Sequence, residues 1–295
     1  MEIAVISGKG GSGKSSIAAA LATAAGRLVL ADCDVDAANQ YLLFNPLHRE
    51  EEIYISGYKA RIMADRCLSC GICHQHCRFG AVMTSGPDYI VDPLKCEGCR
   101  LCAHLCPEQA ITMDPANRSR LFTGDFRYGT LVYGRLAPGE ENSGKLVSLV
   151  REKAKAESLR NKLPLIILDG PPGTGCPVIS TITGVDQVVV VTEASLSGLA
   201  DFRRVMKVVN STKSRVSVII NKADLNTMAD REIETECLEN NWLLLGRIPF
   251  DASFTHAMVA GKSIPEFLPG SGLSKKLLNM YDQLMKNRHE TGKDT

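Results

Sequence analysis

Residues 2–15 read EIAVISGKGGSGKS, and this stretch decides the fold of the chain. Residues 2–7 are an apolar run typical of a buried strand, and the following glycine-rich segment matches the pattern G-x-x-x-x-G-K-S/T. An alanine-rich helix is predicted over residues 15–25. A glycine-rich loop alone could be an ordinary strand-to-helix turn, but here strand, loop, Lys14, Ser15 and helix occur in the order of a phosphate-binding loop.

This loop supplies the groups that bind a nucleoside triphosphate and its magnesium ion. We expect Lys14 to neutralise the β- and γ-phosphates and Ser15 to bind Mg²⁺, while the start of the helix favours an anion. The other loop residues expected at the nucleotide are Gly8, Gly10, Gly11, Ser12, Gly13 and Ser16.

Further apolar runs predict an α/β fold with a mostly parallel sheet and helices on both faces. These runs occupy residues 27–32, 164–169, 185–192 and 216–221. Carboxylates stand at strand ends, where such sheets bind ligands: Asp32, Asp34 and Asp36 after one run, and Asp169 before the loop GPPGTG after another. Asp169 is expected to hold the magnesium shell. The roles of Asp32 and Asp36 stay open, because both also suit caps and turns.

Eight of the eleven cysteines form two copies of the run C-x2-C-x2-C-x3-C. In this pattern three thiolates of one run bind one 4Fe-4S cluster, and the fourth binds the other cluster. We therefore predict one ligand set of Cys67, Cys70, Cys73 and Cys106, and a second set of Cys96, Cys99, Cys102 and Cys77. Zinc needs only four ligands and would leave half of each run without a role. Disulfides need an oxidising compartment, and residues 1–7 carry no export signal.

The two cysteine runs belong to an internal repeat with an offset of 29 residues between Cys67 and Cys96. Flanking strands are predicted at residues 60–63 and 110–113, and a hairpin over residues 81–83 and 89–91. The segment resembles bacterial two-cluster ferredoxins over about residues 58–115. It departs at Arg78, where those proteins usually have a proline.

This pattern predicts two domains. Residues 1–57 and 116–295 are expected to form a discontinuous P-loop ATPase domain, and residues 58–115 an inserted α+β domain with two 4Fe-4S clusters. The net charge of +1 gives no reason to expect nucleic acid as a partner. The apolar stretches are shorter than the ~20 residues of a membrane helix, so membrane contact is not expected. We expect a cytoplasmic protein, and air-sensitive clusters suggest an anaerobe.

The first loop also contains Lys9, and its K-G-G-x-G-K-S form resembles the deviant Walker A motif of the MinD, ParA and Mrp group of P-loop ATPases, which includes the nitrogenase iron protein. Matching segments are residues 32–39, 169–175, 193–195 and 249–251. The resemblance implies ATP/ADP binding, slow and partner-stimulated ATP hydrolysis, and a homodimer that forms on ATP. It further implies that Lys9 reaches the partner's ATP, that Asp34 positions the attacking water, and that Asn221 and Pro249 lie at the nucleotide. The string N-K-x-D at residues 221–224 is also the guanine reader of GTPases, so the residues alone leave GTP open.

Three cysteines and the last helix need separate interpretations. Cys33, Cys176 and Cys237 are expected to be small buried residues. Cys176 follows Asp169 by seven residues, where the nitrogenase iron protein has a ligand of its intersubunit cluster, but the sequence offers no second ligand. Residues 273–285 predict a helix packed on the sheet, with a detachable membrane-binding helix as the alternative.

We expect a nucleotide-driven dimer switch that gates electron transfer by the two clusters to a redox protein partner. An iron-sulfur assembly or carrier ATPase of Mrp type, which would pass clusters to an accepting protein, is one alternative. A MinD- or ParA-like positioning ATPase with redox-sensing clusters is the other.

Overall fold

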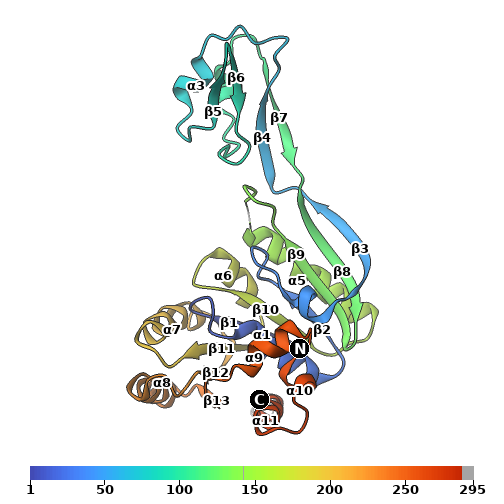
Figure 1. The fold of residues 1–295 in the computed structure, drawn as a ribbon, viewed down its shortest axis with the longest axis vertical. Helices are drawn as coiled ribbons and strands as arrows, with labels where there is room; N and C mark the ends of the chain where they lie inside the picture. Colours follow the sequence, from blue (N-terminus) through green and yellow to red (C-terminus); the bar gives the residue numbers. More distant parts are fainter. Residues whose placement is uncertain (142, 288–295) are drawn as a thin grey trace.

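The computed structural model describes residues 1–141 and 143–287, and within them a nine-stranded sheet forms the centre of the molecule (Figure 1). The strand order is β13-β12-β11-β1-β10-β2-β9-β8-β3. Neighbours from β13 to β9 are parallel, whereas β8 and β3 are antiparallel to their neighbours. The strands are β1 (Glu2–Ser7), β2 (Leu28–Asp32), β3 (Leu47–Tyr54), β8 (Ser119–Phe126), β9 (Gly129–Arg135), β10 (Ile166–Pro172), β11 (Gln187–Glu193), β12 (Arg215–Asn221) and β13 (Leu243–Ile248).

The central strands follow the apolar runs of the sequence. Every residue of β1, β2 and β11 is buried, as expected for parallel strands that helices cover on both faces. The edge strand β3 was not predicted, because its sequence LHREEEIY is polar. Its glutamates pair with lysine and arginine side chains, including Lys153 Nζ at 2.5 Å from Glu50 Oε2, which suits an exposed sheet edge.

Helices cover both faces of the sheet and complete its core. One face packs against α1 (Lys14–Ala25), α2 (Gln40–Phe44), α9 (Ser253–Val259), α10 (Ile264–Phe267) and α11 (Gly272–Lys286). The other packs against α5 (Ser143–Arg160), α6 (Cys176–Ile182), α7 (Leu196–Val209) and α8 (Thr227–Glu239). The prediction of a packed final helix is confirmed, since α11 buries Leu277, Met280 and Leu284. Among the described residues, no helix combines the length and apolar character that a membrane crossing requires.

Residues 57–116 stand away from the large sheet as a small module of their own (Figure 1). Strand β4 (Gly57–Ile62) pairs antiparallel with β7 (Ile111–Ala116), and β5 (Val82–Ser85) pairs with β6 (Asp88–Val91) as a hairpin. Two short helices, α3 (Ile72–His76) and α4 (Leu101–Leu105), follow the first cysteines of the two runs. The hairpin is where the sequence predicts it, whereas β4 and β7 extend three residues further toward the large sheet than the predicted flanking strands.

Candidate functional site

The glycine-rich loop between β1 and α1 forms one wall of a cleft of about 530 Å³. Nine of the residues expected at a nucleotide line it together: Gly10, Gly11, Ser12, Gly13, Lys14, Ser15, Ser16, Asp34 and Asn221. The opposite wall comes from α9 and the segment before it, with Phe250, Asp251, Phe254, Thr255 and Met258. The tertiary structure therefore brings loop, strand-end and C-terminal residues to one site.

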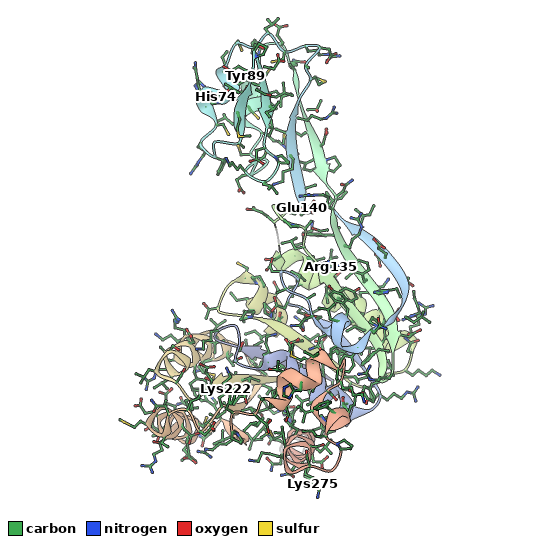
Figure 2. All side chains as sticks on the ribbon, viewed as in Figure 1. His74, Tyr89, Arg135, Glu140, Lys222 and Lys275 are labelled. Carbon is green, nitrogen blue, oxygen red and sulfur yellow. The ribbon has the colours of Figure 1, made fainter. Side chains whose placement is uncertain are left out.

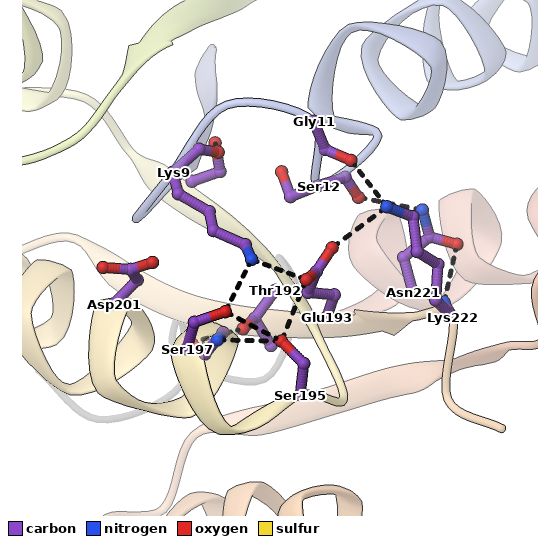
Figure 3. Close-up of polar contacts among 12 residues, drawn as sticks. Lys9, Gly11, Ser12, Thr192, Glu193, Ser195, Ser197, Asp201, Asn221 and Lys222 are labelled. Carbon is purple, nitrogen blue, oxygen red and sulfur yellow. Dashed lines mark hydrogen bonds and ion pairs between the residues drawn. The ribbon is translucent and has the colours of Figure 1, made fainter. Parts of the chain in front are cut away.

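Four expected residues lie outside the lining of this cleft: Gly8, Lys9, Asp169 and Pro249. Gly8 packs against α7, where a Cβ would lie 2.4 Å from the carbonyl oxygen of Asp201, so the close approach requires glycine. Lys9 turns to Glu193, with 2.6 Å between its Nζ and Oε1, and donates to Ser197 Oγ at 2.9 Å (Figure 3). Pro249 is exposed, and the two residues that follow it line the cleft instead.

Lys14 lies at the centre of a buried charge cluster. Its Nζ is 2.6 Å from Asp169 Oδ1 and 3.9 Å from Asp34 Oδ2, and it donates to Ser15 Oγ at 3.2 Å. Burial alone would lower the pKa of Lys14, but the hydrogen bond to Asp169 and the negative charges of Asp169, Asp32 and Asp34 together raise it. The ammonium group therefore stays charged at the floor of the cleft, where phosphate oxygens would be bound.

Asp32 holds the backbone of the next loop in place. Its Oδ1 accepts from the N–H of Asp34 at 3.1 Å, and its Oδ2 accepts from the N–H groups of Asn39 and Gln40 at 2.8 and 3.0 Å. Burial, with Asp169 nearby, raises the pKa of Asp32 to about 7. Asp34 is the carboxylate of this loop that lines the cleft, whereas Asp36 is exposed outside the lining. The open question about Asp32 is thus answered by a structural role.

Gln40 is a site residue that the sequence analysis missed. Its Nε2 donates to Asp169 Oδ2 at 2.7 Å and to the carbonyl oxygen of Ser15 at 2.9 Å. It therefore fixes the carboxylate that holds Lys14. Gln40 directly follows residues 32–39, the segment that resembles a family motif. This adjacency is the only feature of the sequence that indicates a role for Gln40 in the site.

A second polar cluster closes the other side of the loop (Figure 3). Asn221 Nδ2 donates to the carbonyl oxygen of Ser12 at 2.8 Å, and Lys222 Nζ donates to that of Gly11 at 2.9 Å and to Glu193 Oε2 at 3.0 Å. Burial would raise the pKa of Glu193, but hydrogen bonds from Lys9 and Lys222 lower it to about 2. Glu193 thus joins the two lysines that flank the loop.

The module contains two cavities, and four cysteines line each of them. The first cysteine cavity is lined by Cys67, Cys70, Cys73 and Cys106. The second cysteine cavity is lined by Cys77, Cys96, Cys99 and Cys102. The fourth cysteine of each run has crossed to the other cavity, which is the grouping that the spacing predicts.

The donor set of these cavities fits iron-sulfur clusters. Backbone N–H groups of Ala81 and Ala110 point at Cys77 Sγ and Cys106 Sγ at 3.4 and 3.3 Å, so the two repeats share this contact. Burial would raise the pKa of Cys77, but backbone N–H donors, led by Ala81, lower it. Among the described residues, no three His, Cys, Asp or Glu side chains are close enough to hold a single metal ion. N–H groups directed at sulfur are typical around such clusters.

The remaining cysteines divide into two buried residues and one exposed residue. Cys33 and Cys237 lie in the core, which confirms the expectation for them, and burial raises the pKa of both thiols. Cys176 is exposed, so the expectation that it is buried was wrong. The reason is helical geometry: α6 buries Val178, Thr181 and Ile182, and its first residue lies off that face.

Comparisons with known proteins agree with this geometry. Residues 3–264 match the family model of the CobQ/CobB/MinD/ParA nucleotide binding domain. The chain is 36% identical over 233 residues to uncharacterized protein MJ0578 of Methanocaldococcus jannaschii. This match covers 77% of this chain and 80% of that protein. The septum site-determining protein MinD of Pyrococcus horikoshii, solved with Mg-ADP, has a similar fold, with a TM-score of 0.57, 16% identity and 99% of each chain covered.

A shorter match concerns a ferredoxin-like protein. The chain is 36% identical over 53 residues to the ferredoxin-like protein in nif region of Sinorhizobium fredii, and the match covers 16% of this chain and 83% of that protein. Because the family model spans both parts of the large sheet, the chain belongs to the CobQ/CobB/MinD/ParA family of nucleotide-binding proteins.

Proposed function

We propose that the chain is an ATPase in which a nucleotide-driven dimer switch gates electron transfer by two 4Fe-4S clusters to a protein partner. The observation that carries this proposal is the placement of two four-cysteine cavities on a module that continues directly from the sheet of the nucleotide cleft. Each cluster would supply one-electron transfer at low potential. The protein supplies the ligands, the docking geometry and the control by nucleotide.

The residues of the cleft fit MgATP. Lys14 and the backbone N–H groups of the loop would bind the phosphates, and Ser15 Oγ with Asp169 would hold the magnesium shell. Asp34 lines the cleft near Lys14 and would position the attacking water. Phosphate oxygens entering the cleft would compete with Asp169 for Lys14, so binding would change the position of the loop that begins at Asp169.

A continuous set of contacts joins this cleft to the module. Asp32 fixes the segment that contains Val35, and the carbonyl oxygen of Val35 accepts from Leu136 N at 2.9 Å. Leu136 begins the loop of residues 136–141, which we call the connecting loop. Lys59 of β4 donates to the carbonyl oxygen of Gly139 in this loop at 2.7 Å and also to that of Cys96.

Glu140 anchors the connecting loop at the base of the module (Figure 2). Its carboxylate accepts from Ser56 Oγ at 3.1 Å and from the N–H groups of Arg118 and Ser119 at 2.9 and 3.0 Å. The chain passes from the large sheet to the module near Ser56 and returns near Arg118. The Glu140 side chain thus holds both of these segments. A shift of the nucleotide loops would therefore reach the second cysteine cavity through the connecting loop.

The dimer half of the proposal concerns Lys9. In the structure its ammonium group is paired with Glu193, and the Lys9 side chain is 30% exposed. We propose that it leaves Glu193 to contact the nucleotide of a second copy, since Lys222 can continue to neutralise that carboxylate. The ion pair would then keep Lys9 ordered before dimer formation.

The first test is a metal and sulfide analysis of protein purified without oxygen. Two full clusters give about eight iron atoms and eight sulfides per chain. Changing Cys99 to Ser should lower both contents, whereas the matched change Cys237→Ser, in the core of the ATPase domain, should leave them unchanged. Zinc without sulfide would contradict the proposal.

The second test addresses the connection between the sites. In Lys59→Met the ammonium group that joins Gly139 to Cys96 is lost, while the nucleotide cleft is untouched. We expect ATP turnover within about twofold of wild type, but no nucleotide-dependent change in the electron paramagnetic resonance spectrum of the reduced clusters. Lys95→Met, at an exposed lysine of the same module, is the control. An unchanged nucleotide response in Lys59→Met would exclude this route.

A further inference from the structure

The two cysteine cavities are related by the internal repeat, but their mouths differ in charge. The 29-residue offset places Arg78 on Pro107 and Arg100 on Gly71. Arg78 and Arg100 both line the second cysteine cavity, whereas Gly71 and Pro107 line the first. The mouth of the second cysteine cavity thus carries two cations, whereas the corresponding positions at the first cysteine cavity carry none.

The backbone at Arg100 adopts a conformation that favours glycine. Gly71 has φ 78° and Arg100 has φ 65°, so both residues adopt the left-handed conformation at the start of their short helices. Glycine adopts this conformation freely, while other residues are strained there. Strained residues cluster at functional sites, so an arginine at this position points to a role for its charge.

Both arginines are exposed and lie beside exposed aromatic rings. The guanidinium carbon of Arg78 is 5.3 Å from the ring centroid of Phe79, and that of Arg100 is 5.1 Å from the centroid of Tyr58. Phe79 is 37% and Tyr58 44% exposed. Neither arginine has an ion-pair partner in the part of the chain that the structure describes. The acid Glu97 also lines this cavity.

We infer that the mouth of the second cysteine cavity, formed by Tyr58, Arg78, Phe79, Arg100 and Leu101, is the docking surface for a redox protein with an acidic surface. Arginine and aromatic residues are the types enriched at the energetic centres of protein interfaces, and two unpaired cations select a partner of negative charge. Two cations on a chain of net charge +1 are too few for a nucleic-acid surface. This inference rests on the proposed electron-transfer function. It adds which side of the module the partner binds and which charge the partner's surface carries.

Two measurements on the full-length, oxygen-free protein test the inference. The first is binding of fluorescently labelled poly-L-glutamate, a probe of acidic surfaces that requires no electron transfer. The second is the rate at which dithionite-reduced protein is oxidised by the anion Co(EDTA)⁻ and by the cation hexaamminecobalt(III). In each reaction one electron leaves the protein and Co(III) becomes Co(II).

The double variant Arg78→Gln/Arg100→Gln should bind polyglutamate about five- to tenfold more weakly, since each exposed charge contributes modestly. It should react more slowly with Co(EDTA)⁻ and no more slowly with hexaamminecobalt(III). Arg78→Lys/Arg100→Lys should retain most of both properties. Arg231→Gln/Lys275→Gln removes the same charge from the ATPase domain and should change neither.

An equal loss in the control variant, or tighter binding of a single-stranded oligonucleotide of the same charge, would overturn the inference. Unchanged polyglutamate affinity in the double variant would also overturn it. A protein without iron and sulfide would contradict the proposed function instead, and the polyglutamate measurement would still decide whether this surface binds an acidic partner.

Discussion

At the scale of single residues, the nucleotide cleft depends on how buried charges are paired. Lys14 is held by Asp169, Asp169 by Gln40, and the adjoining loop by Asp32. Unpaired charges are costly in such a site, so each member is positioned by another before any nucleotide is present. Phosphates that enter the cleft would therefore have to compete with Asp169 for Lys14.

The change Lys14→Ala tests this pairing. A hydrogen bond to a charged group contributes ~1.5–3 kcal/mol, so we expect MgATP binding to weaken about 10- to 100-fold and turnover to be lost. The visible absorption of the clusters should persist, because the cysteine cavities belong to the module. Lys262→Ala, which removes an exposed lysine, is the control in calorimetric titration and turnover assays. Loss of cluster absorption in Lys14→Ala would show that the two sites do not fold independently.

Cys176 differs from the two buried cysteines because its side chain is exposed. It begins α6, directly after the Gly-Pro loop that follows Asp169. Gly144 of α5 lies beside it, where a Cβ would be 3.5 Å from that of Cys176. The thiol is thus available on the surface next to a loop that nucleotide is proposed to move, whereas Cys33 and Cys237 are enclosed by core residues.

At the scale of elements, the junction of sheet and module depends on the ionised form of Glu140. Burial would raise its pKa, but hydrogen bonds, led by that from Ser119 Oγ, lower it below the ordinary value of 4.5. A carboxylate whose pKa is lower in the folded state stabilises the fold above the unfolded pKa, and this stabilisation is lost as pH falls. We therefore expect the stability advantage of wild type over Glu140→Gln to be full at pH 7 and to shrink below about pH 5.

Denaturant unfolding followed by Trp242 fluorescence measures this difference at each pH. Glu141→Gln is a matched control in the next residue, because a hydrogen bond with Glu97 raises the pKa of Glu141, opposite to the shift at Glu140. A pH-independent difference between wild type and Glu140→Gln would show that the charge at this junction is unimportant.

Helix α11 provides a comparison of two adjacent leucines. Leu277 is 1% exposed and packs in the core, whereas Leu278 is 38% exposed. Leu277→Ala should lower the free energy of unfolding by ~2–5 kcal/mol, the range for core leucines, and Leu278→Ala by less than ~1 kcal/mol. Equal effects in equilibrium unfolding would mean that α11 detaches readily, as a membrane-binding helix would require.

At the scale of the whole molecule, two sites on separate parts of the chain are joined by a short segment. The large sheet and the module are separate parts of the molecule (Figure 1). The large sheet positions the nucleotide cleft, and the module positions the two cysteine cavities. Contacts between them concentrate in the connecting loop, where Gly139 has φ 74° and a Cβ would lie 2.8 Å from Leu94 Cδ2. This close approach lets the loop lie directly against the segment before Cys96.

The sequence by itself determined the local features. The run from Glu2 to Ser15 specifies strand, phosphate loop and helix start, because hydrophobic burial and glycine conformations act over neighbouring residues. The spacing of the cysteines likewise specified which four share a cavity. Both depend on short-range geometry that a motif records.

Only the tertiary structure decided which distant side chains meet. The polar strand β3, the Gln40 contact with Asp169, and the Lys59 contact with Gly139 join segments far apart in the chain. Packing also exposed Cys176 and turned Lys9 toward Glu193. These outcomes depend on which face of an element meets the core and which partner is nearest in space, and a local pattern contains neither.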